Sequence, residues 1–301
     1  MQTTHPTRRI AALAFSFAAF GAMAAPTAVV EGVQMPAWVE RAGVKQPLAA
    51  GMELQSADKI TTGANSRILL RLAEGSQVKL GENALLSLDR LGQRQEGRQT
   101  FLQAALDVAR GAFRFTTDVK AKLASRREVD IRVSTVTAGI RGTDLWGKSA
   151  GDRDIVCLIE GKIAVQRQAE QPITLDQALQ FYIAPKTDGR PDTSKPVQLA
   201  TVTTEQLTQW AQETEIAAGQ GAARRGGKWK VVAVASEDPG VALMVVEKLR
   251  NEGYAAAVFP AGNAARRTYE AHISGLPSRA EAEVLSVRIE PITGVKGRAS
   301  S

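Results

Sequence analysis

The feature that most constrains the fold is a repeat within residues 228–294. The sequence WKVVA at 229–233 recurs in pattern as YEAHI at 269–273, and helical spacing of apolar residues follows each copy. Two strand–helix halves of this size predict a small α+β domain of the split βαβ type over residues 228–301. Both helices of such a domain pack on one sheet face, so the other face is open and favours binding over catalysis.

Strand parity assigns the residues of the two copies to the two faces of this sheet. The aromatic side chains at the strand starts share their face with small or branched apolar residues, which we expect beneath the helices: Trp229, Val231, Ala233, Tyr269, Ala271 and Ile273. The opposite face is expected to carry Lys230, Val232, Glu270, His272 and Ser274, with Phe259 added from another strand. Polar groups beside an apolar platform are what recognition of a sugar chain needs.

The two aromatic strand starts and the sequence SRAEA at 278–282 resemble the SPOR domain, the sporulation-related repeat. The resemblance covers roughly the last quarter of the chain. It implies binding to peptidoglycan glycan strands that lack their peptide stems, through the face just described. Val232 stands where the family favours glutamine, and Glu270 stands where it favours arginine. Loss of wall binding, or use of this face for a protein partner, is therefore the alternative.

The N-terminal segment has the pattern of a secretory signal peptide. Two arginines precede the apolar run 10–20, and Ala22 and Ala24 are the small residues that cleavage requires. An uncleaved anchor is the alternative, although the apolar run is shorter than the roughly 20 residues that span a bilayer. We therefore expect removal of residues 1–24, a periplasmic mature protein and no integral membrane span.

The charge balance is only moderately basic, with 38 lysines and arginines against 31 aspartates and glutamates. This surplus is compatible with adhesion to anionic envelope polymers and equally with an ordinary solvated surface. The chain has no basic stripe interleaved with aromatic residues, so nucleic acid is not an expected partner.

The inventory of reactive side chains argues against an enzyme. His272 is the histidine left after loss of the signal peptide, and no G-x-S-x-G sequence is present. The single cysteine, Cys157, lies in an apolar run and is expected to be a buried, inert thiol. Two carboxylates would suffice for a glycosidase, but the candidates fall in expected turns and strand ends: Asp130, Asp144 and Asp154. We expect no catalytic residue, no cofactor and no metal.

The larger part of the chain, residues 29–185, has an all-β pattern. Short runs rich in branched apolar residues alternate with glycine turns. These runs are 29–33, 37–41, 68–72, 77–80, 85–88, 113–116, 129–133, 155–159 and 163–166. Their spacing indicates a sandwich, a barrel or a solenoid.

Blocks within residues 29–185 resemble the FecR domain family. They are LAAGMEL at 48–54, DKITTG at 58–63, SRILLRL at 66–72, EGSQVKL at 74–80 and AGIRGTDL at 138–145. The resemblance implies a periplasmic all-β domain, in the form of a short solenoid or β-helix-like stack. Founding members of this family are transmembrane regulators that relay a transport signal to a cytoplasmic sigma factor. This chain shows no cytoplasmic helical segment and no retained transmembrane helix, so we expect a scaffold or sensor in the envelope instead.

The AGIRGTDL block is expected to be structural. Gly139 and Gly142 are predicted to form a turn whose backbone is hydrogen-bonded by Thr143 and Asp144. Arg141 on this turn is either an anion contact or a solvated side chain.

Two segments connect the domains. Thr203 and Gln206 form a capping-box pattern that predicts a helix over 203–217, with Trp210 packed on the β domain. The glycine-rich segment 218–227 reads as a flexible tether whose ends average about 15 to 18 Å apart if it behaves as a coil. The two domains are then expected to act independently.

Together, these patterns predict a non-enzymatic envelope protein. The C-terminal domain would bind peptidoglycan glycan strands, and the FecR-like domain would contact an envelope protein partner or the wall. The alternative is a periplasmic regulatory or signalling protein that acts through protein partners. An envelope hydrolase built on a carboxylate pair is the rival from another class.

Overall fold

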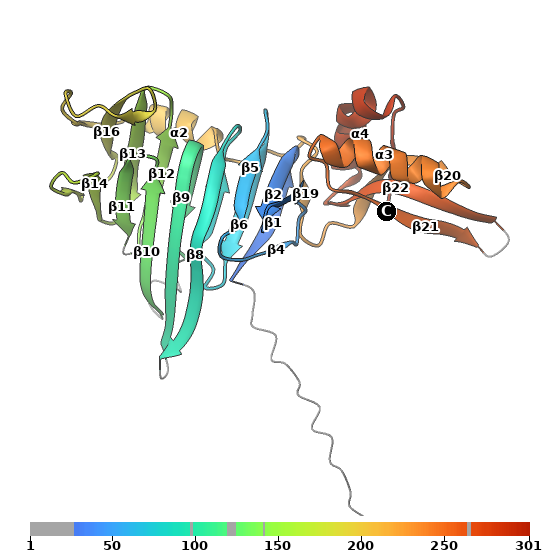
Figure 1. Ribbon diagram of the computed structural model, residues 1–301, viewed down its shortest axis with the longest axis horizontal. Helices are drawn as coiled ribbons and strands as arrows, with labels where there is room; N and C mark the ends of the chain where they lie inside the picture. The colour runs from blue at the N-terminus through green and yellow to red at the C-terminus, as the bar shows by residue number, and fades with distance from the viewer. Residues whose placement is uncertain (1–26, 97–98, 119–124, 141, 264–265) are drawn as a thin grey trace, which may run out of the picture.

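The computed structural model describes residues 27–96, 99–118, 125–140, 142–263 and 266–301. Within these ranges the chain forms an extended β domain and a smaller α+β domain that lies beside one end of it (Figure 1). The expected signal peptide, Arg141 and residues 264–265 lie outside the described residues. None of the described helices is both long enough and apolar enough to span a bilayer.

The first sheet of the β domain is built from strands whose apolar residues alternate with polar ones. In β6 (Arg67–Leu72) the side chains of Ile68, Leu70 and Leu72 are buried while the residues between them are more exposed. Burial of each such side chain contributes about 1.5 to 3 kcal/mol. From edge to edge this sheet contains β19 (Ala223–Arg224), β1 (Ala28–Gln34), β6, β7 (Gln77–Leu80), the second part of β9 (Gln99–Thr116), β12 (Asp144–Ser149), β13 (Arg153–Glu160), β16 (Gln180–Thr187) and β18 (Gln198–Thr201). Two short strands join it, β4 (Glu53–Leu54) beside β1 and β17 (Arg190–Pro191) beside β16.

The second sheet follows the same alternating pattern and shares the core of the first. Its strands, in order, are β3 (Val44–Pro47), β2 (Ala37–Arg41), β5 (Lys59–Thr62), β8 (Leu85–Glu96), the first part of β9, β10 (Ser125–Val133), β11 (Val136–Ile140), β14 (Ile163–Arg167) and β15 (Ile173–Leu175). Buried residues of both sheets form one hydrophobic cluster.

Strand β9 belongs to both sheets and changes sheet at Gly111. Arg110 pairs with Leu85 of β8 in the second sheet, whereas Gly111 pairs with Ser149 of β12 in the first. Gly111 has φ +90°, and a Cβ atom there would lie 2.6 Å from the Cα of Ala84. Glycine is required here because the bend needs both a positive φ and a close approach of two backbones.

The all-β prediction for this domain is confirmed, and among the sandwich, barrel and solenoid forms that the strand spacing allowed, the structure is a sandwich. The chain alternates between the sheets, as in a solenoid, but the described strand pairs are antiparallel except for β9 with β10. Hairpins such as β2–β3, β6–β7 and β12–β13 reverse the chain before it crosses to the other sheet. A β-helix would need parallel neighbours instead.

Helix α2 (Thr204–Gln212) covers part of the outer face of the first sheet. Its N-terminus has the predicted capping box, because the Thr203 hydroxyl accepts from the Gln206 N–H and the Gln206 side chain accepts from the Thr203 N–H. Trp210 stacks on Trp146 of β12, with ring centroids 4.8 Å apart. The predicted packing role of Trp210 is therefore confirmed. The helix ends at Gln212, before the predicted end at 217.

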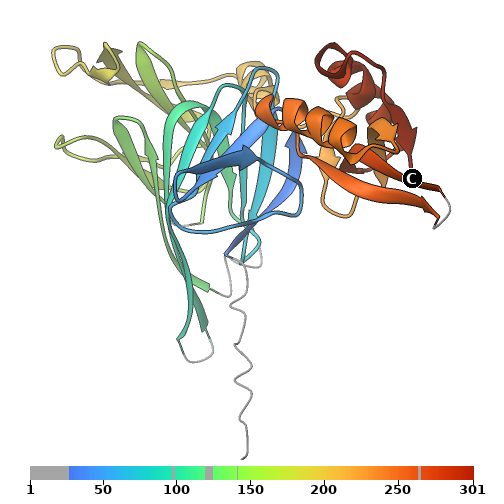
Figure 2. The ribbon, with the colours of Figure 1, turned by 45° about the vertical axis from the view of Figure 1, so that its right-hand side comes forward.

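The C-terminal domain has the predicted order of strand, helix, strand, strand, helix and strand. Its elements are β20 (Trp229–Ser236), α3 (Pro239–Asn251), β21 (Ala256–Asn263), β22 (Arg266–Leu276), α4 (Arg279–Thr293) and β23 (Arg298–Ser300). The sheet order is β21–β22–β20–β23. Both helices lie above one face of this sheet, and among the described residues no helix covers the opposite face (Figures 1 and 2). We call this opposite face the open face.

The glycine-rich segment does not match the tether expected from its composition. Within it, β19 pairs with β1, and the buried carboxylate of Glu281 on α4 accepts hydrogen bonds from the N–H groups of Gly219 and Ala222, at 2.6 and 3.2 Å. A Cβ atom at Gly221 would lie 3.0 Å from the backbone nitrogen of Leu285. These glycines therefore allow close packing of the segment between the two domains, where a coil was predicted.

A second contact joins the domains at the end of α3. The N–H of Ala37 donates to the carbonyl of Gly253, and a Cβ atom at Gly253 would lie 2.6 Å from the indole of Trp38. Arg288 of α4 donates to the carbonyl of Met35. The expectation that the two domains act independently is therefore wrong for this arrangement, in which strand pairing and helix contacts hold them together.

Candidate functional site

The open face of the C-terminal sheet collects the side chains that strand parity assigned to it. Register places Val232 opposite His272, and Phe259 opposite Glu270. Strand β23 adds Arg298 opposite Val232 on the other side of β20. The pairing of the four strands thus determines which side chains lie together on the open face.

An aromatic pair forms the apolar part of this surface. The rings of Phe259 and His272 are parallel within 3°, with centroids 4.3 Å apart. Phe259 is 46% exposed and His272 only 7% exposed, so the phenyl ring shields the imidazole and presents its own surface to solvent. Such a ring is a platform on which a flat apolar face of a ligand can stack.

A shared carboxylate forms the charged part, which we call the Glu270 cluster. Lys230 Nζ lies 2.8 Å from Glu270 Oε2, and an Arg298 guanidinium nitrogen lies 3.6 Å from Glu270 Oε1. His272 Nδ1 lies 3.9 Å from Glu270 Oε2 and makes no hydrogen bond with a described residue. Lys230 and Arg298 supply two positive charges against the one negative charge of Glu270, so the cluster has a net positive charge.

The imidazole at the centre of the open face is held neutral by its surroundings. Burial lowers the pKa of His272, the nearby Lys230 ammonium lowers it further, and Glu270 opposes both effects. A neutral ring stacks on Phe259 without the desolvation cost of an imidazolium. His272 therefore acts as part of the platform at neutral pH.

The structure brings together most of the residues predicted for this site. Lys230, Phe259, Glu270 and His272 contact one another in the way described above. Val232 lies beneath them and is only 5% exposed, so it supports the platform without offering surface. Ser274 is exposed and takes no part in the described hydrogen bonds or ion pairs. It is outside the cluster.

Arg298 was missed in the sequence, and a β-bulge was missed with it. Strand β23 is only three residues long and polar, so its register has no clear signal in the sequence. In β20 the pairing register shifts between Val232 and Val234, which leaves Ala233 as the extra residue. Ala233 is buried, as predicted, but beyond it the alternation of faces is displaced by one residue, so Ala235 is opposite Glu270.

The AGIRGTDL block in the β domain is structural in a different way from the one predicted. Gly142 has φ +79° and forms the turn, whereas Gly139 lies within β11 opposite Asp130. Asp144 accepts two hydrogen bonds from Arg114, at 3.0 and 2.7 Å, where a backbone contact was predicted. The carbonyl of Thr143 accepts from both the N–H and the hydroxyl of Thr117. The block thus fixes β12 against β9.

The other candidate carboxylates and the thiol also have structural surroundings. Asp130 is an exposed residue of β10, and Asp154 is fully buried in β13, where it forms an ion pair of 2.7 Å with Lys186. Cys157 is buried under α2, and burial, together with the charge of Asp144, raises the pKa of its thiol to about 12. An inert thiol was predicted, and these surroundings agree with that prediction.

Comparison with known proteins places one part of the chain in a family. Residues 58–164 match the family model described as FecR protein. No curated protein matches the chain, and the comparisons give no support to a SPOR domain at the C-terminus.

The solved structures that resemble the chain include two crystal structures of a putative anti-sigma factor from Parabacteroides distasonis ATCC 8503. One has a TM-score of 0.39 and 14% identity, and the match covers 51% of this chain and 64% of that one. The other has a TM-score of 0.38 and 14% identity, with 80% and 93% covered. These scores carry no argument about arrangement or activity. The match to the FecR family model covers residues 58–164, which lie within the larger β sandwich.

Proposed function

We propose that this protein is a non-enzymatic regulatory protein of the cell envelope that acts through a protein partner bound by its β domain. The FecR family match over residues 58–164 carries the proposal, because that family is regulatory and works through protein contacts. A regulatory domain of this kind acts by binding another protein chain. We therefore expect the β domain to offer a surface to which another chain can bind.

The surface best suited to such a partner is the free edge of the first sheet at β18. This strand pairs with β16 on one side, and its other side has no described partner strand. All of its residues are exposed, including the large apolar side chain of Leu199 at 52%. An exposed edge with unpaired N–H and C=O groups is a template for strand addition by another chain.

A photo-crosslinking experiment in living cells tests this proposal. Benzoylphenylalanine placed at Leu199 should capture the same envelope protein in repeated experiments, and the same probe at the exposed Lys162 should not. Replacement of Thr201 by proline, which removes a backbone donor from the side of β18 that faces away from β16, should abolish the crosslink. Absence of a defined product, or equal products at both positions, contradicts the proposal.

A second candidate function, peptidoglycan binding by the C-terminal domain, is favoured by the stacked Phe259 and His272 beside the Glu270 cluster. Sugar rings stack on aromatic platforms, and their hydroxyl groups accept and donate hydrogen bonds to charged side chains. The SPOR resemblance of the sequence points to the same surface.

Sedimentation of the full chain with purified cell-wall sacculi tests the second candidate. Exchange of Lys230 and His272 together for alanine should reduce the sedimented fraction, whereas exchange of Lys248 and Arg250 on the exposed side of α3 for alanine should not. Equal sedimentation of both double variants would move the site elsewhere. No sedimentation of the parent protein would remove the function.

We also propose that the protein works in the periplasm after cleavage behind Ala24. The carrying observation is the small-residue pattern at Ala22 and Ala24 that follows the apolar run. Intact mass of the protein from the envelope fraction should correspond to a chain that begins at Ala25. A chain that keeps residues 1–24 would contradict cleavage.

A further inference from the structure

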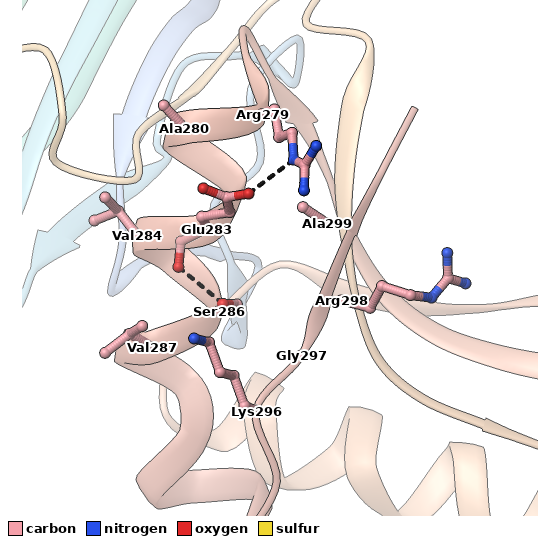
Figure 3. A pocket seen from close by; sticks show the side chains of 10 residues that line it. All are labelled: Arg279, Ala280, Glu283, Val284, Ser286, Val287, Lys296, Gly297, Arg298 and Ala299. Atoms are coloured by element: carbon pink, nitrogen blue, oxygen red, sulfur yellow. Dashed lines mark hydrogen bonds and ion pairs between the residues drawn. The ribbon is translucent and has the colours of Figure 1, made fainter.

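A hollow of the C-terminal domain lies between α4 and the edge strand β23. It has a volume of about 540 Å³. Its lining comes from one side of α4 and from the backbone that leads into β23 (Figure 3). No residue of the β domain lines it. A ligand in this groove would therefore contact the C-terminal domain alone.

One wall of the groove is an incomplete sheet edge. Strand β23 pairs with β20 through Arg298, Ala299 and Ser300, and the described residues include no strand on its other side. Its outward N–H and C=O groups are therefore available to an added strand. Peptides that complete a sheet in this way obtain affinity from backbone hydrogen bonds and specificity from alternate side chains.

The other wall supplies contacts for those alternate side chains. Ala280, Val284 and Val287 of α4 line the groove, and Val287 is 54% exposed although it is a large apolar residue. Figure 3 shows Val284 and Val287 on neighbouring turns of the helix that borders the groove. Small branched side chains of an added strand would cover them, which removes apolar surface from water.

The rim of the groove is positively charged. Arg279, Lys296 and Arg298 line it, against one carboxylate, Glu283, which forms an ion pair of 2.8 Å with Arg279. Within the part of the chain that the structure describes, Lys296 has no ion-pair partner. Arg298 is 66% exposed and lies 3.6 Å from Glu270. Such a rim attracts carboxylates on the ligand.

We propose that the groove between α4 and β23 binds an extended acidic peptide segment of a protein partner, which adds to the edge of β23 and places alternate apolar side chains against Val284 and Val287. The groove shares Arg298 with the Glu270 cluster but contains no residue of the Phe259 platform or of β18, so the proposal does not depend on either function argued above. It gives the C-terminal domain a peptide-binding role that needs neither a glycan nor the Phe259 platform.

Fluorescence anisotropy with the full chain tests the proposal. The probe is a fluorescein-labelled hexapeptide of alternating valine and glutamate with blocked ends. We expect saturable binding, a loss of at least tenfold in affinity for Val287→Asp and for Lys296→Glu, and no change for Leu243→Asp, an equally exposed apolar residue of α3. Because Val287 and Lys296 are exposed, both variants should fold as the parent does, which circular dichroism verifies.

Two further probes separate strand addition from simple charge attraction. A peptide with N-methylated valines keeps the charge but cannot donate to β23, and it should bind at least tenfold more weakly. A peptide of alternating valine and lysine should bind Lys296→Glu better than it binds the parent. The proposal is overturned if the parent does not bind the acidic peptide, if the N-methylated peptide binds equally, or if Val287→Asp binds as the parent does. Self-association that Val287→Asp abolishes would assign the groove to a second copy of this chain and overturn the peptide partner as well.

Discussion

The two domains each contain a carboxylate paired with a lysine, and the two pairs have opposite surroundings. Asp154 and Lys186 in the β domain expose 0% and 3% of their side chains, whereas Glu270 and Lys230 on the open face expose 12% and 28%. The buried pair has fixed neighbours, since Thr135 donates twice to Asp154 and Lys186 donates to Ser149. Glu270 is instead shared between two cations, Lys230 and Arg298.

This difference separates a structural pair from one that a ligand can enter. A buried carboxylate that loses its partner has no water to replace it, so the pair is fixed in the folded state. A carboxylate near the surface can exchange one cation for another, or for a ligand group, at little cost. The same distinction applies to the aromatic residues. The ring of Trp210 packs α2 against Trp146, whereas Phe259 stacks on His272 and still exposes one face to solvent.

The largest expected effect is on the buried pair. Lys186→Met should lower the free energy of unfolding by about 3 to 5 kcal/mol, because it leaves the charge of Asp154 buried and unpaired. Chemical denaturation measures this loss. Asp154→Asn combined with Lys186→Met removes both charges and should recover much of the stability. A single variant that costs no more than loss of Lys230 would show that the two pairs are equivalent.

A smaller effect is expected at the covered face under α2. Trp210→Ala removes the ring that stacks on Trp146 and should cost about 2 to 3 kcal/mol. Cys157 lies in the same cluster, so the variant should also react faster with a polar alkylating reagent, whereas the native thiol should react only after unfolding. Trp210→Phe is the matched control and should retain most of both properties. Unchanged labelling in Trp210→Ala would show that α2 does not protect the thiol.

Much of the architecture could be predicted because alternation and glycine placement are local signals. The all-β pattern, the capping box at Thr203, the packing of Trp210 and the two strand–helix halves are all present in the structure. The site residues Lys230, Phe259, Glu270 and His272 follow from strand parity in the same way. The choice of a sandwich over a solenoid depends on which strands pair, and pairing is not encoded locally.

The predictions failed where tertiary contacts determine the structure of a segment and its amino-acid composition does not. Glycines at 219–227 suggested a coil, yet they are used for close approach, since a Cβ atom at Gly221 would contact Leu285. Glu281 reads as a helix-opening acid but is buried and accepts from the segment that precedes it. The bulge at Ala233, beyond which the alternation of faces in β20 is displaced by one residue, was not predicted. None of these features has a signal within a single element.

On the open face, loss of one cation should matter little to folding. Lys230→Met should change the free energy of unfolding by no more than about 1 kcal/mol, because the pair is partly exposed and Arg298 can take its place beside Glu270. Thermal unfolding in low and high salt measures the effect, which should shrink as salt is added. A loss as large as that of Lys186→Met would mean that the Glu270 cluster is structural and would remove the contrast between the two domains.

The smallest expected effect is a pH dependence that originates in the platform itself. The pKa of His272 is lowered in the folded state, whereas an unfolded histidine titrates near 6.5. Between those two pKa values the unfolded chain binds more protons than the folded one, so the stability falls as pH decreases from about 7 to below the lowered folded pKa. Equilibrium unfolding between pH 5 and pH 7.5 should show this slope, set by burial and Lys230 against the opposing Glu270.

The variant His272→Phe isolates that slope. A phenyl ring keeps the stack on Phe259 but cannot take up a proton, so stability should vary less between pH 7 and pH 5 than in the parent. The comparison is clean because residues 27–301 contain no other histidine. Equal slopes for parent and variant would place the titrating group elsewhere. A steeper stability loss in the parent means that the folded state favours a neutral imidazole in the platform, as burial and the nearby Lys230 require.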